Sequence, residues 1–510
     1  MSDFIKGSIF ITFSNYLFFI VSFIFSIFIV RILPVFEYGV VGYYATVYTI
    51  LFPLYHLSLH SAITHFISKY PDENWKVLTN SIKIFLLWSP LITITSFFLF
   101  LFFQNIIFIL LMIIFLVNSI IQFILGYFRG VLKFKFYSII LILNNFVTLF
   151  AFVFILISNT AIFYYIGYVC AIVLICLISV YLLRKNKPDT QKTSNIKETD
   201  KTISKRELLA YAIPLLLLSF VSFFGAQFDK LLIFHTEGEI IAGNYYFLIF
   251  YTSILGSLFL SINDALFPVI SGKFYKENTE EINVYYQNIL KFSLLIYFFI
   301  MTYLVLLSAP IINFFFGTKY LAYIYLLGIL FFSSIFSVFG YCTTTMYLSH
   351  NIVKKMAFYL VVINIFSILI KTLLIITYGI IGACISLLII NLISQIILIK
   401  VLLRYTNLIF PKTDVLKVGS IGIVNFLIFY SIIFTLSPVF WILSLYLIGS
   451  IIFLVLLIRF SRVFHPADFE IIRIILQNLK FSKQLTLKII RFLKILFLTS
   501  SMKIQNQVIE

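Results

Sequence analysis

Long runs of apolar residues alternate with short polar segments along almost the whole chain. Each run is continuous and about 20 residues or longer, which matches a helix that crosses a bilayer rather than a barrel strand. The sequence therefore predicts an all-α polytopic membrane protein. Its fourteen expected transmembrane helices lie at about residues 8–30, 39–63, 82–103, 106–128, 136–158, 161–183, 208–234, 243–269, 291–316, 322–348, 357–378, 380–403, 417–437 and 440–460.

One polar segment, residues 184–207, separates the first six expected helices from the next six. It has almost no apolar residues and is net basic, so it reads as a solvated cytoplasmic linker. The predicted organisation comprises a six-helix lobe at 1–183, the linker at 184–207, a second six-helix lobe at 208–404, two additional helices at 405–460 and a basic amphipathic cytoplasmic tail at 461–510.

The two halves carry similar short motifs at matched places. Residues 37–44 read EYGVVGYY and residues 239–246 read EIIAGNYY, each at the start of a predicted even-numbered helix. A second pair begins at Asn145 and Asn364, in the fifth and eleventh helices. Six helices per half gives both halves the same orientation, so we expect a pseudo-twofold axis along the membrane normal and alternating access between paired lobes.

Composition and charge support a membrane protein. The chain is 62% hydrophobic and 11% charged, whereas a soluble domain carries roughly a quarter charged residues. The net charge of +18 arises from lysines and arginines that gather in alternate loops. That bias indicates a multi-pass cell-membrane protein with both termini in the cytoplasm, and it argues against nucleic acid as a partner. The basic tail is expected to lie on anionic membrane lipids.

Charged residues inside predicted helices are costly, so each needs a reason. Arg31 closes the first helix, and it either binds phosphate, snorkels to the interface or pairs with Glu37. Asp229 and Lys230 lie near the outer end of the seventh helix. They either help to form an outer gate or bind the cargo, or they serve as an anchoring carboxylate and a lysine that reaches the interface.

Three further charges are candidates. Lys371 lies well inside the eleventh helix with no acid nearby in the sequence, so it either faces water, an acid or a phosphate, or it snorkels to the interface. Asp264 in the eighth helix is a candidate ion-coupling carboxylate, a partner for a lysine or a packing residue. Arg129 stands at the expected cytoplasmic mouth, where it either meets incoming head groups or is an ordinary loop arginine.

His56 and His60 share one helix face at a spacing that suits a metal, but no Glu or Cys accompanies them. Interior polar contacts are the preferred interpretation. The sequence shows no phosphate-binding glycine loop, zinc pattern or catalytic triad, so we expect no metal, cofactor or catalytic residue, and no enzymatic activity.

The order and spacing of several short motifs resemble one family. They are FSIFIVRILPVFEYGVVGYY at Phe25–Tyr44, ISKY at Ile67–Tyr70, FRGVLKF at Phe128–Phe134, LLAYAIPLLL at Leu208–Leu217, FDKLLI at Phe228–Ile233, AGNYY at Ala242–Tyr246, LFPVIS at Leu266–Ser271 and APIINFFFGTKY at Ala309–Tyr320. Together they resemble the polysaccharide transporter branch of the multidrug/oligosaccharidyl-lipid/polysaccharide exporter superfamily.

That resemblance implies two six-helix lobes with two added helices. It also implies a flippase that moves a polyprenyl-pyrophosphate-linked oligosaccharide from the cytoplasmic to the outer leaflet, as a monomer that works with other polysaccharide-assembly proteins. A multidrug or organic-cation antiporter of the same superfamily is the nearest alternative, although the first six expected helices hold no carboxylate apart from Glu37 at a loop edge. A glycan polymerase or ligase is the alternative from another class, and the short outer loops argue against it.

Overall fold

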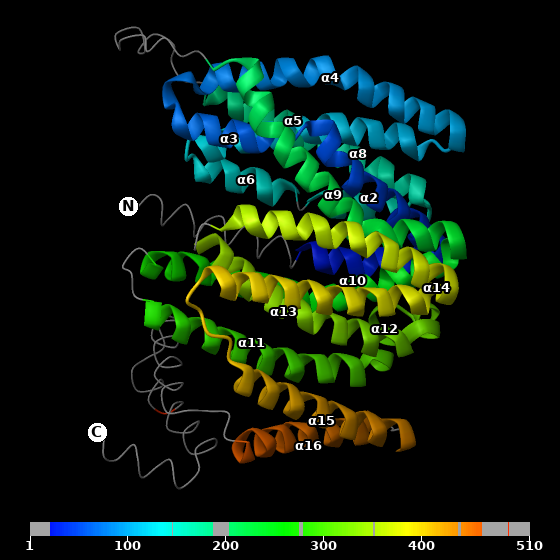
Figure 1. Ribbon diagram of the computed structural model, residues 1–510. Helices are drawn as coiled ribbons and strands as arrows, with labels where there is room; N and C mark the ends of the chain where they lie inside the picture. The colour runs from blue at the N-terminus through cyan, green and yellow to red at the C-terminus, as the bar shows by residue number, and fades with distance from the viewer. Residues whose placement is uncertain are drawn as a thin grey trace. The chain divides into compact units, whose positions relative to one another are not determined.

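The computed structural model describes residues 21–144, 146–186, 203–274, 279–349, 352–436, 440–461 and 488 (Figure 1). All regular structure in these ranges is helical. After a first helix at Val21–Ile32, the elements are α2 (Val35–His56), α3 (Leu59–Lys69), η1 (Pro71–Glu73), α4 (Asn74–Phe103), α5 (Ile107–Gly130), α6 (Phe134–Asn144), α7 (Phe146–Ile155), α8 (Ala161–Lys185), α9 (Lys205–Glu237), α10 (Glu239–Phe274), α11 (Thr279–Leu306), α12 (Ser308–Phe315), η2 (Thr318–Leu326), α13 (Leu327–Ser349), α14 (Val353–Tyr405), α15 (Lys412–Leu436) and α16 (Phe440–Phe460).

The expected polytopic all-α membrane fold is confirmed. Within the described ranges, 10 helices are long and apolar enough to cross a membrane. One of them, α14, has 53 residues and is interrupted at Gly379, whose φ is 55°. Its length of about 80 Å exceeds twice the thickness of a bilayer core, and the interruption falls between two predicted helices, 357–378 and 380–403. The full count of fourteen stays a prediction.

Two predicted helices are broken, which the hydrophobic pattern did not indicate. The expected helix at 39–63 stops at His56 and resumes at Leu59, so it becomes α2 and α3. The expected helix at 291–316 becomes α11 and α12, which are separated at Leu307. Pro310 explains the second break, because proline has no N–H to donate to the carbonyl four residues earlier and its ring crowds that turn.

The end of the predicted linker is ordered rather than solvated. Ile203 is buried, and its backbone N–H donates to Glu73 Oε2 over 3.0 Å. Ser204 and Glu207 then form a reciprocal capping box that starts α9 at Lys205. This is the Ser-x-x-Glu signature of a helix start. The helix therefore begins three residues before the predicted start at 208. The rest of the linker, 187–202, and the tail after Ser461, except Lys488, lie outside the described residues.

Contacts divide the chain into two compact units. Unit 1 comprises Met1–Tyr251, Ile312–Leu326 and Ala357–Ile390, and unit 2 comprises Thr252–Ile311, Leu327–Met356 and Asn391–Glu510. The boundaries fall within α10, α12 and α14 and between η2 and α13. The lobes at 1–183 and 208–404 are a different division of the chain and stay a prediction.

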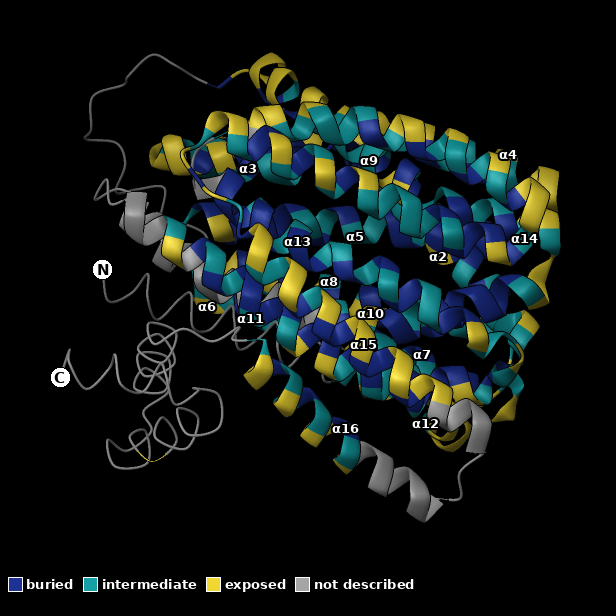
Figure 2. Cartoon of the chain, turned by 60° about the horizontal axis from the view of Figure 1, so that its bottom comes forward, coloured by how far each residue is buried: buried dark blue, intermediate teal, exposed yellow. Residues whose placement is uncertain are grey.

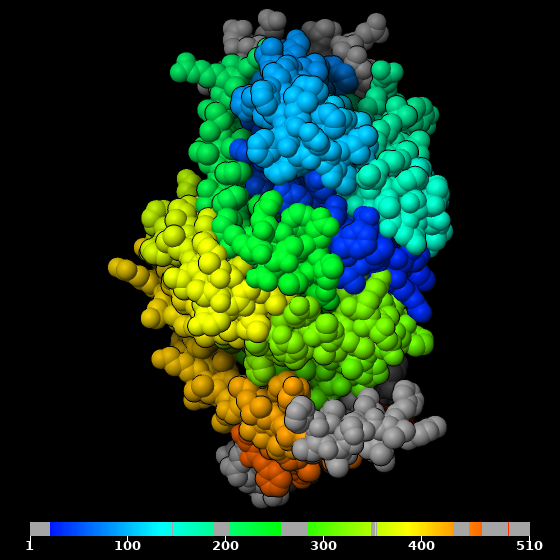
Figure 3. Space-filling view, turned by 90° about the vertical axis from the view of Figure 1, so that its right-hand side faces the viewer, coloured from blue at the N-terminus to red at the C-terminus, as the bar shows by residue number. Residues whose placement is uncertain are grey.

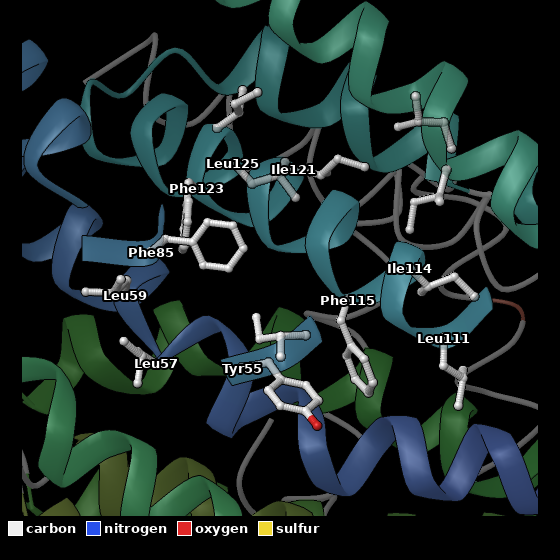
Figure 4. Close-up of a cluster of buried hydrophobic side chains, with 14 of the residues drawn as sticks. Tyr55, Leu57, Leu59, Phe85, Leu111, Ile114, Phe115, Ile121, Phe123 and Leu125 are labelled. Atoms are coloured by element: carbon white, nitrogen blue, oxygen red, sulfur yellow. The ribbon is translucent and has the colours of Figure 1, made fainter. Parts of the chain in front are cut away.

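The core of unit 1 is built from α2 to α5 and α8. Figure 4 shows part of it, where Tyr55, Phe85, Phe115 and Phe123 point into one apolar cluster. Most residues of α5 are buried or half-buried, whereas α4 exposes a row of large apolar side chains (Figure 2). Phe102, in the last turn of α4, is 82% exposed. Figure 3 shows light-blue residues of this part of the chain on the surface. An apolar exposed row is what a lipid-facing helix requires.

The two copies of the repeated motif meet in space within unit 1. A Cβ built at Gly39 would lie 2.1 Å from the carbonyl oxygen of Glu239, and one built at Gly243 would lie 2.1 Å from that of Val35. The starts of α2 and α10 therefore cross at backbone contact, which small residues allow in membranes. This crossing gives the glycines of both motifs a physical role.

We expect Gly39→Ala to destabilise the protein. The added methyl group must push the two helices apart, at a cost of roughly 1–3 kcal/mol. Thermal unfolding of the purified protein in detergent would show a lower Tm. Gly328→Ala is the matched control, because open space surrounds Gly328. Equal Tm values for the two variants would contradict the backbone crossing.

Candidate functional site

A buried ion pair joins α9 to the first part of α14. Lys371 Nζ lies 2.6 Å from Asp229 Oδ1, and each side chain is 2% exposed. The two residues are 142 positions apart in the chain. Of the interpretations of Lys371, the structure shows an acid facing it, and the side chain does not snorkel. Asp229 is buried and joins two helices, as the interpretation of an anchoring carboxylate expects.

The lysine ammonium has its three N–H donors engaged. Besides Asp229, it donates to the carbonyl oxygens of Gly225 at 2.8 Å and Ala226 at 3.2 Å. Gly225 also permits the approach of α14, because a Cβ there would come within 2.7 Å of Asn364 Cβ. A fully satisfied ammonium of this kind has no donor left for a ligand in this arrangement.

A third helix completes the cluster. The Tyr245 hydroxyl, from α10, donates to Asp229 Oδ2, so both carboxylate oxygens accept hydrogen bonds. Tyr245 is fully buried and belongs to the second copy of the repeated motif. We call Asp229, Lys371 and Tyr245 the buried charge cluster. It fastens α9, α10 and α14 together.

Lys230 follows the cluster directly but differs from Lys371. Its side chain is half-buried, and no hydrogen-bond or ion-pair partner for its ammonium is found among the described residues. Its backbone carbonyl accepts a hydrogen bond from the Tyr246 hydroxyl at 2.8 Å. The main chain is thus held in place while the charged end of the side chain keeps its donors.

Arg31 takes part in a reciprocal contact between helix ends. Its Nη1 donates to the carbonyl of Phe314, near the end of α12, over 3.0 Å. In return, Lys319 Nζ donates to the carbonyls of Arg31, at 2.9 Å, and Leu33, beyond the end of the first helix. Each cation lies where carbonyl groups of a helix C-terminus lack partners. Arg31 is exposed, and among the described residues no other partner occupies the remaining four of its five N–H donors.

Glu37 does not pair with Arg31. Its Oε2 accepts from the backbone N–H of Ala161 at 2.7 Å, so it caps the first turn of α8. A carboxylate at a helix N-terminus is favoured by the unpaired N–H groups and the helix dipole. The alternative of an Arg31–Glu37 ion pair is therefore not what the structure shows.

The other predicted charges lie apart from the buried charge cluster. Arg129 is exposed in the last turn of α5. Asp264 falls in α10, but its side chain lies outside the described part of the structure. His56 and His60 contact each other, with Nε2 and Nδ1 separated by 3.0 Å. Among the described residues, no set of three His, Cys, Asp or Glu side chains could hold a metal ion.

An apolar groove runs between α2 and α4. Its volume is about 710 Å³, and it is lined mainly by Leu, Phe and Trp side chains. The polar atoms in its wall are satisfied internally: Trp88 Nε1 donates to the Leu54 carbonyl, and the Tyr55 and Thr95 hydroxyls share a hydrogen bond. The groove therefore presents a carbon surface that suits a lipid chain.

Sequence reasoning missed two members of these sites, Tyr245 and Lys319. Tyr245 lies in the repeated motif, which could have marked it as a structurally important residue. Nothing in the sequence identifies Asp229 as its partner. Lys319 lies in the motif at Ala309–Tyr320, but nothing in that motif marks it as a contact residue. Its role depends on the end of the first helix, 286 residues away at Leu33, so no local pattern could reveal it.

Comparisons with known proteins agree on the fold. A family model described as polysaccharide biosynthesis protein matches residues 4–274, and no curated protein matches. The lipid II flippase MurJ in an inward closed conformation is similar over 89% of this chain and 98% of its own, with 17% identity and a TM-score of 0.64. An inward-facing multidrug resistance MATE transporter of the MOP superfamily is similar over 78% and 98%, with 17% identity and a TM-score of 0.58. A MOP superfamily transporter from Pyrococcus furiosus, whose binding pocket is described as having reverse polarity, covers 78% and 95% with 15% identity and a TM-score of 0.54.

We expect the buried ion pair to show strong coupling in a double-mutant cycle. Lys371→Met alone leaves an unpaired buried carboxylate, and Asp229→Leu alone leaves an unpaired buried ammonium, each costing about 3–5 kcal/mol. The double variant removes both charges and should recover much of that loss. Unfolding in detergent measures all four proteins. Additive losses in the double variant would contradict the pairing.

Proposed function

Because this chain belongs to the polysaccharide biosynthesis protein family, we propose that it is a flippase for a lipid-linked glycan. Its cargo is a polyprenyl-(pyro)phosphate-linked oligosaccharide, which it moves from the cytoplasmic to the outer leaflet by alternating access. The work is transport, with no covalent chemistry required of the protein. It acts as a monomer in the cell membrane, with both termini in the cytoplasm, and it supplies other polysaccharide-assembly proteins, as in O-antigen synthesis.

The observation that carries this proposal is that the buried acid of unit 1 is paired, whereas several of its cations are not. The buried acid, Asp229, is neutralised by Lys371 and accepts a hydrogen bond from Tyr245. The cations Lys230, Arg31 and Arg129, in contrast, keep donors that no acidic side chain occupies among the described residues. A transporter with spare positive charge suits an anionic cargo, and the (pyro)phosphate is the anionic part of this one.

The proposed roles follow from the contacts. Arg31 binds phosphate oxygens with its remaining N–H donors, since a guanidinium can contact two oxygens at once. Lys230 supplies a second positive charge, and Arg129 meets the head group at the cytoplasmic mouth. Lys371 and Asp229 hold α9 in place, so that the ammonium of Lys230 is available to the head group of the cargo. The groove between α2 and α4 suits part of the polyprenyl tail. Asp264 is retained as a candidate carboxylate for ion coupling.

The alternative is a cation antiporter, which the MATE-like fold permits. Such a pump requires a membrane carboxylate that is free to bind a proton or cation. In unit 1, Asp229 is engaged by a lysine and Glu37 caps a helix, so neither of these two carboxylates is free. A glycan polymerase or ligase would need a catalytic group on a large outer loop, which the sequence does not provide.

Deletion of the gene in its host should abolish a surface glycan. The lipid-linked precursor should accumulate on the cytoplasmic leaflet, because the step that moves it outward is lost. Glycan staining together with leaflet-specific labelling of the precursor measures both effects. An intact glycan combined with new sensitivity to cationic drugs would replace the flippase by the antiporter.

We expect Arg31→Gln and Lys230→Gln each to lower glycan export about tenfold or more while protein level holds. Each substitution removes a charge-assisted hydrogen bond to the anionic head group, worth about 1.5–3 kcal/mol. Export by the variant gene in the deletion strain is the measurement. Arg184→Gln is the matched control, since Arg184 is also exposed but lies in the last turn of α8, before the linker. Equal export by all three variants would remove Arg31 and Lys230 from the cargo site.

A further inference from the structure

The break between α2 and α3 has an unusual backbone. Leu57 and Ser58 both adopt the left-handed conformation, with φ of 54° and 50°, and neither is a glycine. Leu57 is 8% exposed and Leu59 is 0% exposed, so the break lies in the apolar cluster of unit 1 (Figure 4). Leucine rarely adopts this conformation, which makes the break a specific feature of the fold.

A chain of hydrogen bonds through two imidazoles spans this break. His56 Nδ1 lies 2.6 Å from the Phe52 carbonyl oxygen, and His56 Nε2 lies 3.0 Å from His60 Nδ1. His60 Nε2 lies 3.1 Å from Ser61 Oγ. The two rings are stacked, with centroids 4.9 Å apart. All four ring nitrogens therefore have a partner.

The partners fix the direction of every bond in the neutral pair. A carbonyl oxygen only accepts, so His56 Nδ1 carries the proton and His56 Nε2 is the acceptor. His60 Nδ1 must then donate to it, and His60 Nε2 accepts from the Ser61 hydroxyl. One continuous donor-to-acceptor chain thus runs from Ser61 to Phe52.

We propose that His56 and His60 together form a binding site for one proton. A proton taken from water binds His60 Nε2, which becomes a donor to Ser61 Oγ, and the Ser61 hydroxyl turns its own hydrogen away. His60 Nδ1–H can then pass its proton to His56 Nε2, so that the charge moves to His56. In both positions each ring nitrogen keeps a hydrogen-bond partner.

The geometry allows only one added proton. If both rings were cationic, His56 Nε2–H and His60 Nδ1–H would be two donors facing each other at 3.0 Å. The hydrogen bond between the rings would be lost and two positive charges would repel. The site therefore binds one proton per molecule, and its titration should have a slope of one.

Burial opposes a charge more strongly on His56 than on half-buried His60, whereas the fixed charges around the pair oppose it less on His56. His56 ends α2, where unpaired carbonyls favour a cation. Arg129 on α5 acts electrostatically on His60 and repels a charge there. Most other charged or titratable groups on the packed helices are exposed or engaged elsewhere: Lys76 (with Glu73) and Lys83 on α4, Tyr127 (against Trp75) on α5, and Glu207 (capping box), Tyr211 (on His65) and Asp229 on α9. Lys230 on α9 is half-buried, and no partner for its ammonium is found among the described residues.

The site has one accessible end and one buried end. Ser61 and His60 are half-buried, whereas His56 is 4% exposed beside the left-handed residues. A proton enters near Ser61, which lies toward the predicted cytoplasmic end, and its charge is carried to the break. Protonation thus places a charge where α2 and α3 join, so that the angle between these helices responds to pH. This property goes beyond the proposed cargo and does not depend on it.

The test uses Trp88 as a reporter of the break. Its indole donates to the Leu54 carbonyl over 3.2 Å, two residues before His56. In the full chain carrying W75F and W441F, Trp88 emission is followed between pH 4.5 and 8 in detergent without any cargo. We expect one transition with a slope of one, which His56→Phe and His60→Phe each abolish. His65→Phe is the matched control and should keep the transition.

A second variant keeps both rings. Ser61→Ala removes the acceptor for the protonated ring, and a charged hydrogen bond is stronger than a neutral one, so the midpoint should fall by roughly one pH unit. A transition that survives in both His56→Phe and His60→Phe, or a midpoint unchanged in Ser61→Ala, would overturn the proposal. An absence of any transition in the parent would do the same. Because no glycan is present, none of these results bears on the flippase activity.

Discussion

Two opposite charges, Asp229 on α9 and Lys371 on α14, lie 2.6 Å apart where almost no water reaches them. Taking such ions out of water costs several kcal/mol each, so the pair is tolerated only when every donor and acceptor is engaged. Here two carbonyls of α9 and the Tyr245 hydroxyl of α10 complete the set. The three helices must therefore come together in one register, or a charge is left buried without a partner.

This requirement separates the charges that hold unit 1 together from those that are available to a ligand. Lys371 and Asp229 neutralise each other. Within the described part of the chain, Lys230, one residue along the same helix, keeps its donors, and Arg31 keeps four of its own while it fastens the first helix to α12. The charges on these two residues are positive. The packing of unit 1 therefore leaves cations that can bind an anionic head group. The apolar groove between α2 and α4 supplies a surface of the opposite character, suited to a lipid tail.

Much of the fold could be predicted from the sequence, since runs of apolar residues require helices that cross a bilayer. Four charges could also be singled out, because a charged side chain inside a membrane-spanning helix is costly. They are Arg31, Asp229, Lys230 and Lys371. Their partners could not, because Asp229 and Lys371 are 142 residues apart and neither carries a local sign of the other. The break at Leu57 was equally hidden, because neither residue there is a glycine or a proline. The glycines of the repeated motif were visible, and only the structure shows that the two copies touch.

Transport by the purified protein in liposomes would decide most directly whether its spare positive charge serves an anionic lipid cargo. A polyprenyl diphosphate with a fluorescent group at its head is placed in the membrane, and a membrane-impermeant reductant destroys the fluorescence of the outer leaflet only. If the protein moves this lipid, nearly all the fluorescence is lost in protein-containing liposomes, while about half survives in protein-free ones. Equal survival in the two samples, together with uptake of an organic cation by the protein, would contradict the anionic-cargo interpretation.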